Sequence, residues 1–231
     1  MGLSGRGSAG ILPARVPKIF CLSRREVKPT IHGMRGSRIR TRGYLPHWES
    51  EGGIYFVTFR LADSLPQSVL RALQMSEIQK PEEERQLAKK LEDFLDQGAG
   101  ACVLGHPRIA EIAASALRKF DGTRYRMLAW CVMPNHVHVV FQPSREDDLP
   151  GILHAWKSFT GVEINRRLSR SGALWQKEYY DHLIRDGEQL NRAIRYTAEN
   201  PAKAGMNNWP YVYVSAEAFG GPAGRDVSRF R

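Results

Sequence analysis

The sequence predicts an α+β domain in which strands and helices alternate along the chain. Three runs rich in β-branched and aromatic residues, at 52–62, 124–133 and 136–143, are typical of strands. Apolar stripes at helical spacing follow at 106–122 and 147–169, with proline near each start. A chain of 231 residues, 42% of them hydrophobic, is long enough for one such domain with appendages.

The first half of the chain is expected to hold one strand and several helices. The strand runs from Gly52 to Ala62, GGIYFVTFRLA. Residues 65–100 carry two charged amphipathic pieces split by Pro81, which indicates a helical insertion on the surface. The helix predicted at 106–122 has Pro107 in its first turn. Its apolar stripe should bury Ile109, Ile112, Ala116, Leu117 and Phe120.

A hairpin and a long helix come next. The strands at 124–133 and 136–143 are joined by Pro134 and Asn135, which we interpret as the turn. The helix predicted at 147–169 has Asp148 as its N-cap and Pro150 near its first turn. Trp156 and Phe159, three residues apart, are expected to face its core.

The last predicted elements are a strand from Tyr179 to Ile184 and a helix from Asp186. Asp186 and Gln189 resemble a capping box, and Pro201 is expected to end the helix at Asn200. Without the insertion the order is β-α-β-β-α-β, the ferredoxin-like split pattern, followed by an extra C-terminal helix. We expect an antiparallel sheet with the helices on one face and the other face open.

Charge divides the chain into three parts. The net charge is +10, and residues 1–43 alone hold ten Lys and Arg against one acid. We expect 1–43 to be a disordered basic arm, which can bind phosphate backbones or serve only as a leader. A true start at Met34 is a further alternative. The domain then spans 44–210, and 211–231 form a tail.

Hydrophobic runs and cysteine spacing predict the cellular compartment of the protein. No run reaches the eighteen or so apolar residues of a membrane span, and the first residues lack a secretory apolar segment. The three cysteines are scattered with no CxxC, which is typical of a reducing compartment. We therefore expect a cytoplasmic, nucleoid-associated protein with no membrane partner.

Two histidines share one face of a predicted strand. Alternation puts His136, His138 and Val140 on one side and three apolar residues on the other. The pair can reach one cation from the open face of the sheet. The alternative is that both are ordinary polar residues on a wet strand face.

The last helix carries a tyrosine away from its apolar stripe. That stripe consists of Leu190, Ala193, Ile194, Thr197 and Ala198. Tyr196 lies on a flank with Asn200, one turn later, so a phenol and a carboxamide project together. The alternative is a tyrosine that fills the core boundary.

The motifs MPNHVHVVF and YTAENPAKAG together resemble the HUH single-strand DNA endonucleases, and most closely the REP-associated tyrosine transposases. Three further motifs are present, FVTFRL, HAWKSFTG and LWQKEYYDH. All five motifs occur in the family's order, between about Tyr44 and Trp209. The resemblance implies that His136 and His138 are ligands of Mg²⁺ or Mn²⁺, that Tyr196 is the nucleophile, and that Asn200 is the third ligand.

The resemblance also implies an activity. Attack by Tyr196 on single-stranded or hairpin DNA would give a 5′-phosphotyrosyl intermediate and allow later rejoining without ATP. Asn is shorter than the Gln that related enzymes often carry at the third-ligand position. The protein would be a monomer or a homodimer. The alternative is a non-catalytic DNA-binding protein on the same fold.

Other residues are further candidates. A histidine-triad nucleotide hydrolase is disfavoured, because Val140 stands where a third alternating histidine is needed. Tyr179 and Tyr180 are rival nucleophiles, and His182 is a candidate third ligand or acid/base. The candidate DNA contacts are Lys157, Arg166, Arg167, Arg192, Arg195 and Lys203.

Overall fold

A five-stranded antiparallel sheet forms the centre of the computed structural model, which describes residues 38–41, 46–65, 69, 86, 90, 94–95 and 98–219. The strand order is β6-β3-β5-β4-β7. These strands are β3 (Ile54–Arg60), β4 (Tyr125–Val132), β5 (His136–Pro143), β6 (Tyr180–Ile184) and β7 (Val212–Val214). A separate two-stranded sheet consists of β1 (Arg38–Thr41) and β2 (Pro46–Glu49).

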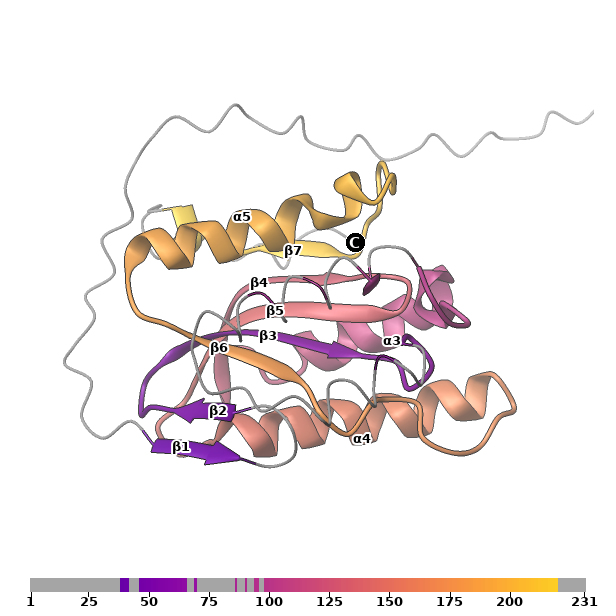
Figure 1. Cartoon of the computed structure of the whole chain (residues 1–231), viewed down its shortest axis with the longest axis horizontal. Coiled ribbons are helices and arrows are strands. Elements are labelled where there is room, and N and C mark those ends of the chain that lie inside the picture. Colours follow the sequence, from indigo (N-terminus) through magenta and orange to yellow (C-terminus); the bar gives the residue numbers. More distant parts are fainter. Residues whose placement is uncertain are drawn as a thin grey trace, which may run out of the picture.

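Helices lie on both faces of the central sheet (Figure 1). They are α3 (Pro107–Arg118), α4 (Leu149–Arg167) and α5 (Gly187–Lys203), with short 3₁₀ turns η1 (Val103–Gly105) and η2 (Ala216–Phe219). The order β3-α3-β4-β5-α4-β6 and the arrangement of these four strands confirm the predicted split β-α-β-β-α-β pattern.

The expectation of an open sheet face is wrong. α3 and α4 pack on one face, and α5 packs across the other, over β4 and β5. Leu190 and Ile194 of α5 are buried against Phe56 and Val140 of the sheet. The physical reason is that α5 has its own apolar stripe, which needs a partner, and this sheet face supplies one.

The alternation predicted for β5 is confirmed. Val137, Val139 and Phe141 belong to the core under α3 and α4, whereas Val140 belongs to the core under α5. Since residues 136 and 138 share the side of Val140, the two histidines lie on the α5 face.

The helices begin at the predicted residues, but two aromatic residues expected in the core are exposed. His106 is the N-cap of α3 with Pro107 in the first turn, and Asp148 accepts a hydrogen bond from the Gly151 amide at the start of α4. Phe120 and Phe159 were expected in the core, yet they are 39% and 52% exposed. Phe120 follows the end of α3, and Phe159 lies beside the face that buries Trp156.

The predicted end of the last helix at Asn200 is also wrong. α5 continues through Pro201 to Lys203, because proline in the last turn removes only one amide donor. The helix is terminated after Lys203 by Gly205, which follows the C-cap Ala204 and has a φ of 77°. The Met206 amide donates to the Pro201 carbonyl and the Gly205 amide to the Ala202 carbonyl, as in a Schellman motif.

Two strands differ from the predicted division of the chain into an arm, a domain and a tail. β1 lies within the segment expected to be a disordered arm, and β7 lies within the expected tail, where it pairs with β4. Most of the predicted insertion at 65–100 falls outside the described residues. None of the helices that the structure describes is long and apolar enough to cross a membrane.

Candidate active site

His136 and His138 converge on one point below α5. Their Nε2 atoms are 2.9 Å apart, and their ring centroids are separated by 4.5 Å with the rings nearly perpendicular. Both side chains are buried, with 1% and 0% exposure. The prediction that the two imidazoles share one face is therefore confirmed. Their burial excludes the alternative of two polar residues on a solvent-exposed strand face.

Each imidazole is held at its other nitrogen. His136 Nδ1 lies 2.7 Å from Asn135 Oδ1, and His138 Nδ1 lies 2.8 Å from the Thr58 hydroxyl of β3. The Asn135 amide nitrogen donates to the carbonyls of Leu95 and Ala99, at 3.1 and 3.0 Å. Because both amide protons are used there, the Asn135 oxygen faces His136 and accepts from it.

This bonding defines the tautomer of the pair. His136 carries its proton on Nδ1, so its Nε2 presents a lone pair, and His138 Nε2 donates to it. His138 Nδ1 then accepts from Thr58. A cation bound by both Nε2 atoms requires the proton of His138 to move to Nδ1. The Thr58 hydroxyl can then accept a hydrogen bond from Nδ1–H of His138, because a hydroxyl is both donor and acceptor.

Burial keeps both imidazoles neutral. Desolvation lowers the pKa of His136 well below its ordinary value of 6.5, and the neighbouring His138 lowers it further. Desolvation alone lowers the pKa of His138 to about 3. At physiological pH both rings therefore keep a lone pair for a metal ion.

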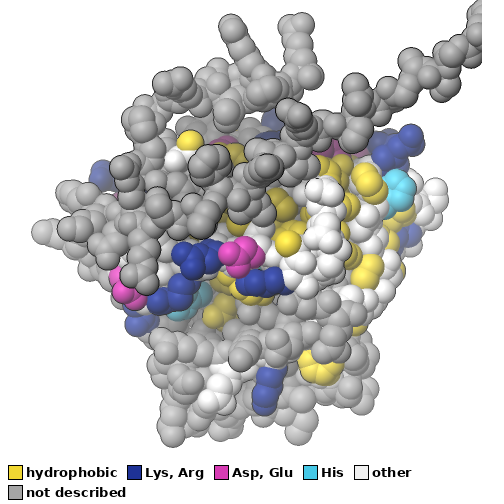
Figure 2. All heavy atoms as spheres, turned by 90° about the horizontal axis from the view of Figure 1, so that it is seen from above, with side chains coloured by type: hydrophobic (Ala, Val, Ile, Leu, Met, Phe, Trp, Pro, Cys, Tyr) yellow, Lys and Arg dark blue, Asp and Glu magenta, His cyan; other side chains and the backbone are white. Residues whose placement is uncertain are grey.

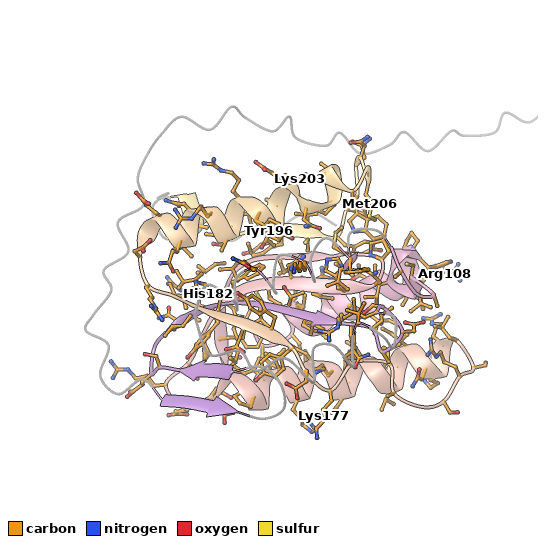
Figure 3. The ribbon with its side chains drawn as sticks, viewed as in Figure 1. Arg108, Lys177, His182, Tyr196, Lys203 and Met206 are labelled. Carbon is orange, nitrogen blue, oxygen red and sulfur yellow. The ribbon has the colours of Figure 1, made fainter. Side chains whose placement is uncertain are left out.

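Tyr196 lies on α5, on the side of the helix that faces the sheet (Figure 3). Its ring lies 5.2 Å from the His138 ring and 5.9 Å from that of Phe56, both edge-on. Phe56 stacks in turn on His138 at 5.5 Å. The Lys203 ammonium lies 5.7 Å from the centre of the tyrosine ring, so a positive charge accompanies the phenol.

Asn200 is the residue of α5 whose burial most needs an explanation. Its side chain is 1% exposed, and neither amide atom has a hydrogen-bond partner among the described residues. An amide buried in this way costs about 1–3 kcal/mol of stability. Such a cost is typical of a group that awaits a ligand.

These residues fit a divalent cation. Two nitrogens bound at right angles to one octahedral ion, at about 2.1 Å, are about 3 Å apart, as the Nε2 atoms are. An amide oxygen, such as that of Asn200, is a ligand that Mg²⁺ and Mn²⁺ accept. Within the described ranges no group of three His, Cys, Asp or Glu side chains could hold a metal ion.

The other candidates from β6 and its preceding loop lie elsewhere. His182 shares the sheet face of the pair, but its Nε2 is bonded to Gln189 Oε1 at 3.1 Å, at the start of α5. Tyr180 lies on the same face, edge-on to Phe56 at 6.5 Å. Tyr179 belongs to the core on the opposite face, with Lys157 over its ring. The structure therefore does not bring His182 or Tyr179 to the histidine pair.

Most of the candidate DNA contacts are exposed. Figure 2 shows basic side chains interleaved with acidic ones on the face seen from above. On α5, Arg192 pairs with Glu188 at 3.3 Å and Lys203 with Glu199 at 3.1 Å, while on α4 Arg166 pairs with Glu163 at 2.7 Å. In the described part of the chain no ion pair is found for Arg167 or Arg195. Lys157 is half-buried beside the 172–179 segment.

Sequence reasoning missed three residues of the site. The sequence pattern predicts only a turn at Asn135, although its side chain holds His136. Thr58 and Phe56 contact His138 from the neighbouring strand. A signal existed in FVTFR, where alternation puts Phe56 and Thr58 on one face. The pattern does not show that β3 pairs with β5, because strand pairing is a contact between distant segments of the chain.

Comparisons with known proteins all find similarity to transposases. Residues 106–200 match the family described as "Transposase IS200 like". A Haemophilus influenzae protein with the provisional name REP-associated tyrosine transposase is 30% identical over 101 residues, 38% of this chain and 57% of that protein. The Escherichia coli REP-associated tyrosine transposase is 26% identical over 95 residues, 38% of this chain and 53% of that protein. The matched region therefore spans about half the length of these relatives.

A solved structure of a REP-associated tyrosine transposase bound to a REP hairpin is also similar, with a TM-score of 0.42 and 18% identity. The similarity covers 70% of this chain and 76% of that one. The matched family segment includes His136, His138, Tyr196 and Asn200. Residues 106–200 therefore match the IS200-like transposase family, and the chain is similar over this region to the REP-associated tyrosine transposases.

Proposed function

We propose that this protein is a metal-dependent nickase and strand transferase for single-stranded DNA, acting on hairpins of the REP type. Tyr196 is the nucleophile, and His136, His138 and Asn200 hold the cation. The family of residues 106–200 and the names of the relatives support the class of substrate.

One observation carries this proposal. The phenol of Tyr196 lies against His138, with ring centroids 5.2 Å apart, although 58 positions separate them in the chain. Asn200, one turn after the tyrosine, buries an amide without a partner among the described residues. A nucleophile and three metal-binding groups on one sheet face are the parts that a phosphoryl transfer needs.

The chemistry exchanges one phosphodiester for another. The bond between Tyr196 Oη and phosphorus forms while the bond from phosphorus to O3′ breaks. The phenol proton is released to solvent and the leaving O3′ takes up a proton. Because the phosphotyrosine keeps the energy of the bond, a 3′-OH can attack it in the reverse sense and rejoin the strands.

The protein groups have separate tasks. A cation bound by the two imidazoles and the Asn200 oxygen would act as a Lewis acid on the scissile phosphate. Asn135 and Thr58 orient the imidazoles, and burial keeps these neutral. The Lys203 ammonium lies 5.7 Å from the centre of the Tyr196 ring, where it can contact a phosphate that approaches the phenol.

DNA needs access to this site. Because His136 and His138 are 1% and 0% exposed, the side chains that cover them must move before a phosphate can enter. α5 packs over this face and carries the nucleophile, so we expect the helix to shift on DNA binding.

The direct test is a covalent adduct assay. The full chain is mixed with a labelled single strand that contains a REP-type hairpin, in Mn²⁺ or in EDTA, and resolved on a denaturing gel. We expect a protein–DNA band in Mn²⁺ only, which Tyr196→Phe abolishes. Tyr180→Phe is the matched control, because Tyr180 lies on the same sheet face and should leave the band unchanged.

A band that survives Tyr196→Phe would overturn the assignment of the nucleophile. Binding of hairpin DNA without any band, at every metal tested, would instead favour the second candidate, a non-catalytic DNA-binding protein. The closed cover over the histidine pair is the observation that keeps this second candidate in view.

A further inference from the structure

A groove separates α4 from the segment that returns from α4 to β6. Figure 1 shows this segment running back along the helix. The groove has a volume of about 570 Å³ and is lined by residues of α4 and of 172–179. It lies on the sheet face of α3 and α4, opposite the face of His138, so it is separate from the candidate active site.

The lining combines apolar and polar surface. Leu153, Leu174 and Trp175 contribute buried apolar side chains, and Gly161 leaves room beside the indole. The Asn165 amide nitrogen donates to the Gly172 carbonyl at 2.8 Å. Its oxygen is buried and has no hydrogen-bond partner among the described residues. The groove therefore offers an acceptor to a ligand that carries an N–H donor.

Cations outnumber acids in the lining. Lys157 and Lys177 stand against Glu178. The Lys157 ammonium donates to the Lys177 carbonyl at 2.9 Å and lies 5.5 Å from the centre of the Tyr179 ring. Lys177 is exposed and points away from the sheet (Figure 3). This balance favours an anionic ligand over a cationic one.

The outer rim of the groove is apolar and exposed. Val162 lines the groove and is 66% exposed. Phe159, one turn before it on α4, is 52% exposed. Phe159 lies outside the groove lining, but an exposed ring on the same helix can stack a base of a single-stranded nucleic acid.

We propose that this groove binds an unpaired nucleotide of the DNA substrate, outside the cleavage site. The base would lie in the groove with an N–H group on Asn165, a neighbouring base would stack on Phe159, and Lys157 and Lys177 would accompany the phosphates. The volume lies in the range of small-molecule pockets, about 300–1,000 Å³. The inference rests on the proposed function, because it takes single-stranded DNA as the substrate.

The test compares a base-containing strand with a strand of phosphates alone. The probes are a fluorescein-labelled oligodeoxyadenylate and an abasic oligomer of equal length, and their affinity for the full chain with Tyr196→Phe is measured by anisotropy. We expect the strand with bases to bind about tenfold more tightly, as stacking of one base provides. In this background Asn165→Leu and Val162→Ser should each reduce that ratio several-fold. Neither changes a charge, so binding of the abasic strand should stay constant.

Asn207→Leu, an exposed asparagine after α5, is the matched control and should keep the full ratio. Thermal unfolding checks that the variants fold, and Val162→Ser removes only an exposed side chain. An unchanged ratio in both groove variants would overturn the inference, whether or not the adduct forms. A reduced ratio without any adduct in the chain that retains Tyr196 would keep the groove and remove the proposed catalysis.

Discussion

At the scale of single residues, the site exchanges stability for binding capacity. Asn200 buries an amide without a partner in the described structure, and the two histidines bury imidazoles that must remain uncharged. Each of these groups costs free energy in the absence of a ligand. On the proposed function, the same groups would regain that energy when a cation binds, which is why such costs cluster at functional sites.

Asn200→Leu should separate the two effects. We expect the free energy of unfolding without metal to rise by about 1 kcal/mol, because an unpaired amide is replaced by an apolar side chain of similar size. The affinity for Mn²⁺ should fall at least tenfold. Thermal unfolding in EDTA and calorimetric titration with Mn²⁺ measure these quantities.

Thr197→Val is the control for Asn200→Leu, since the Thr197 hydroxyl is already bonded to the Ala193 carbonyl at 2.8 Å. It should give no gain in stability and no loss of Mn²⁺ affinity. A large loss of stability in Asn200→Leu would mean that the amide has a structural role.

His138 should make the metal-free protein sensitive to acid. Its folded pKa of about 3 lies below the ordinary value of 6.5, so the unfolded chain binds a proton first as the pH falls. The free energy of unfolding should therefore decrease from pH 6.5 towards pH 3, by up to about 1.4 kcal/mol per pH unit. Urea unfolding in EDTA at several pH values measures this slope.

His138→Phe should reduce the slope of that acid destabilisation, whereas substitution of the exposed His154 by Asn should not. An equal slope in His138→Phe and the parent would show that other groups cause the acid sensitivity.

At the scale of elements, α5 and β7 complete the sheet. α5 begins with Asp186, whose carboxylate accepts from the Gln189 amide at 2.7 Å, and ends in the Schellman motif at Gly205. These ends set which turn of the helix lies above the histidines. β7 then returns along β4, where Tyr213 stacks on Trp130 with ring centroids 6.0 Å apart.

Truncation tests the role of β7. A chain that ends after residue 210 loses β7 and η2, although the sequence pattern placed the domain boundary there. We expect its free energy of unfolding to fall by on the order of 2 kcal/mol, since an aromatic stack and the β4 pairing are lost. A chain that ends after residue 219 is the control and should unfold like the full chain. Equal stability of the two truncations would remove β7 from the folded core.

At the scale of the whole molecule, metal binding and folding should be linked. A cation that binds only the folded site stabilises it by about 2.7 kcal/mol at a hundredfold excess over its dissociation constant. We expect Mn²⁺ to raise the melting temperature of the full chain, and His136→Ala to abolish the rise. His106→Ala, at the N-cap of α3, should retain it. An equal rise in His136→Ala and the parent would place the cation elsewhere.

The basic N-terminal segment should act on DNA affinity and not on catalysis. Residues 1–37 hold seven of the 34 Lys and Arg of the chain. Their removal should weaken binding to a random single strand and flatten the dependence of log affinity on log salt, because fewer counterions are released. The yield of adduct at saturating DNA should not change. Filter binding between low and moderate salt measures the slope, with a Gly/Ser segment of equal length as the control.

The sequence by itself determined the elements and the side of the sheet on which the histidines lie. Strand alternation, the Asp148 and Asp186 caps and the hairpin at 133–135 are local signals, and local backbone preference decides them. The off-stripe Tyr196 with Asn200 was also readable from helical spacing. The ordered motifs then indicated the family.

Only the tertiary structure decided that the site is covered. α5 lies on the histidine face, Asn135 reaches the carbonyls of Leu95 and Ala99, and β7 joins β4, all through contacts between distant segments. Such contacts depend on which apolar surfaces find one another during packing, and no local spacing encodes that choice. For the same reason the groove beside α4 could not be foreseen, because two separate segments form its walls.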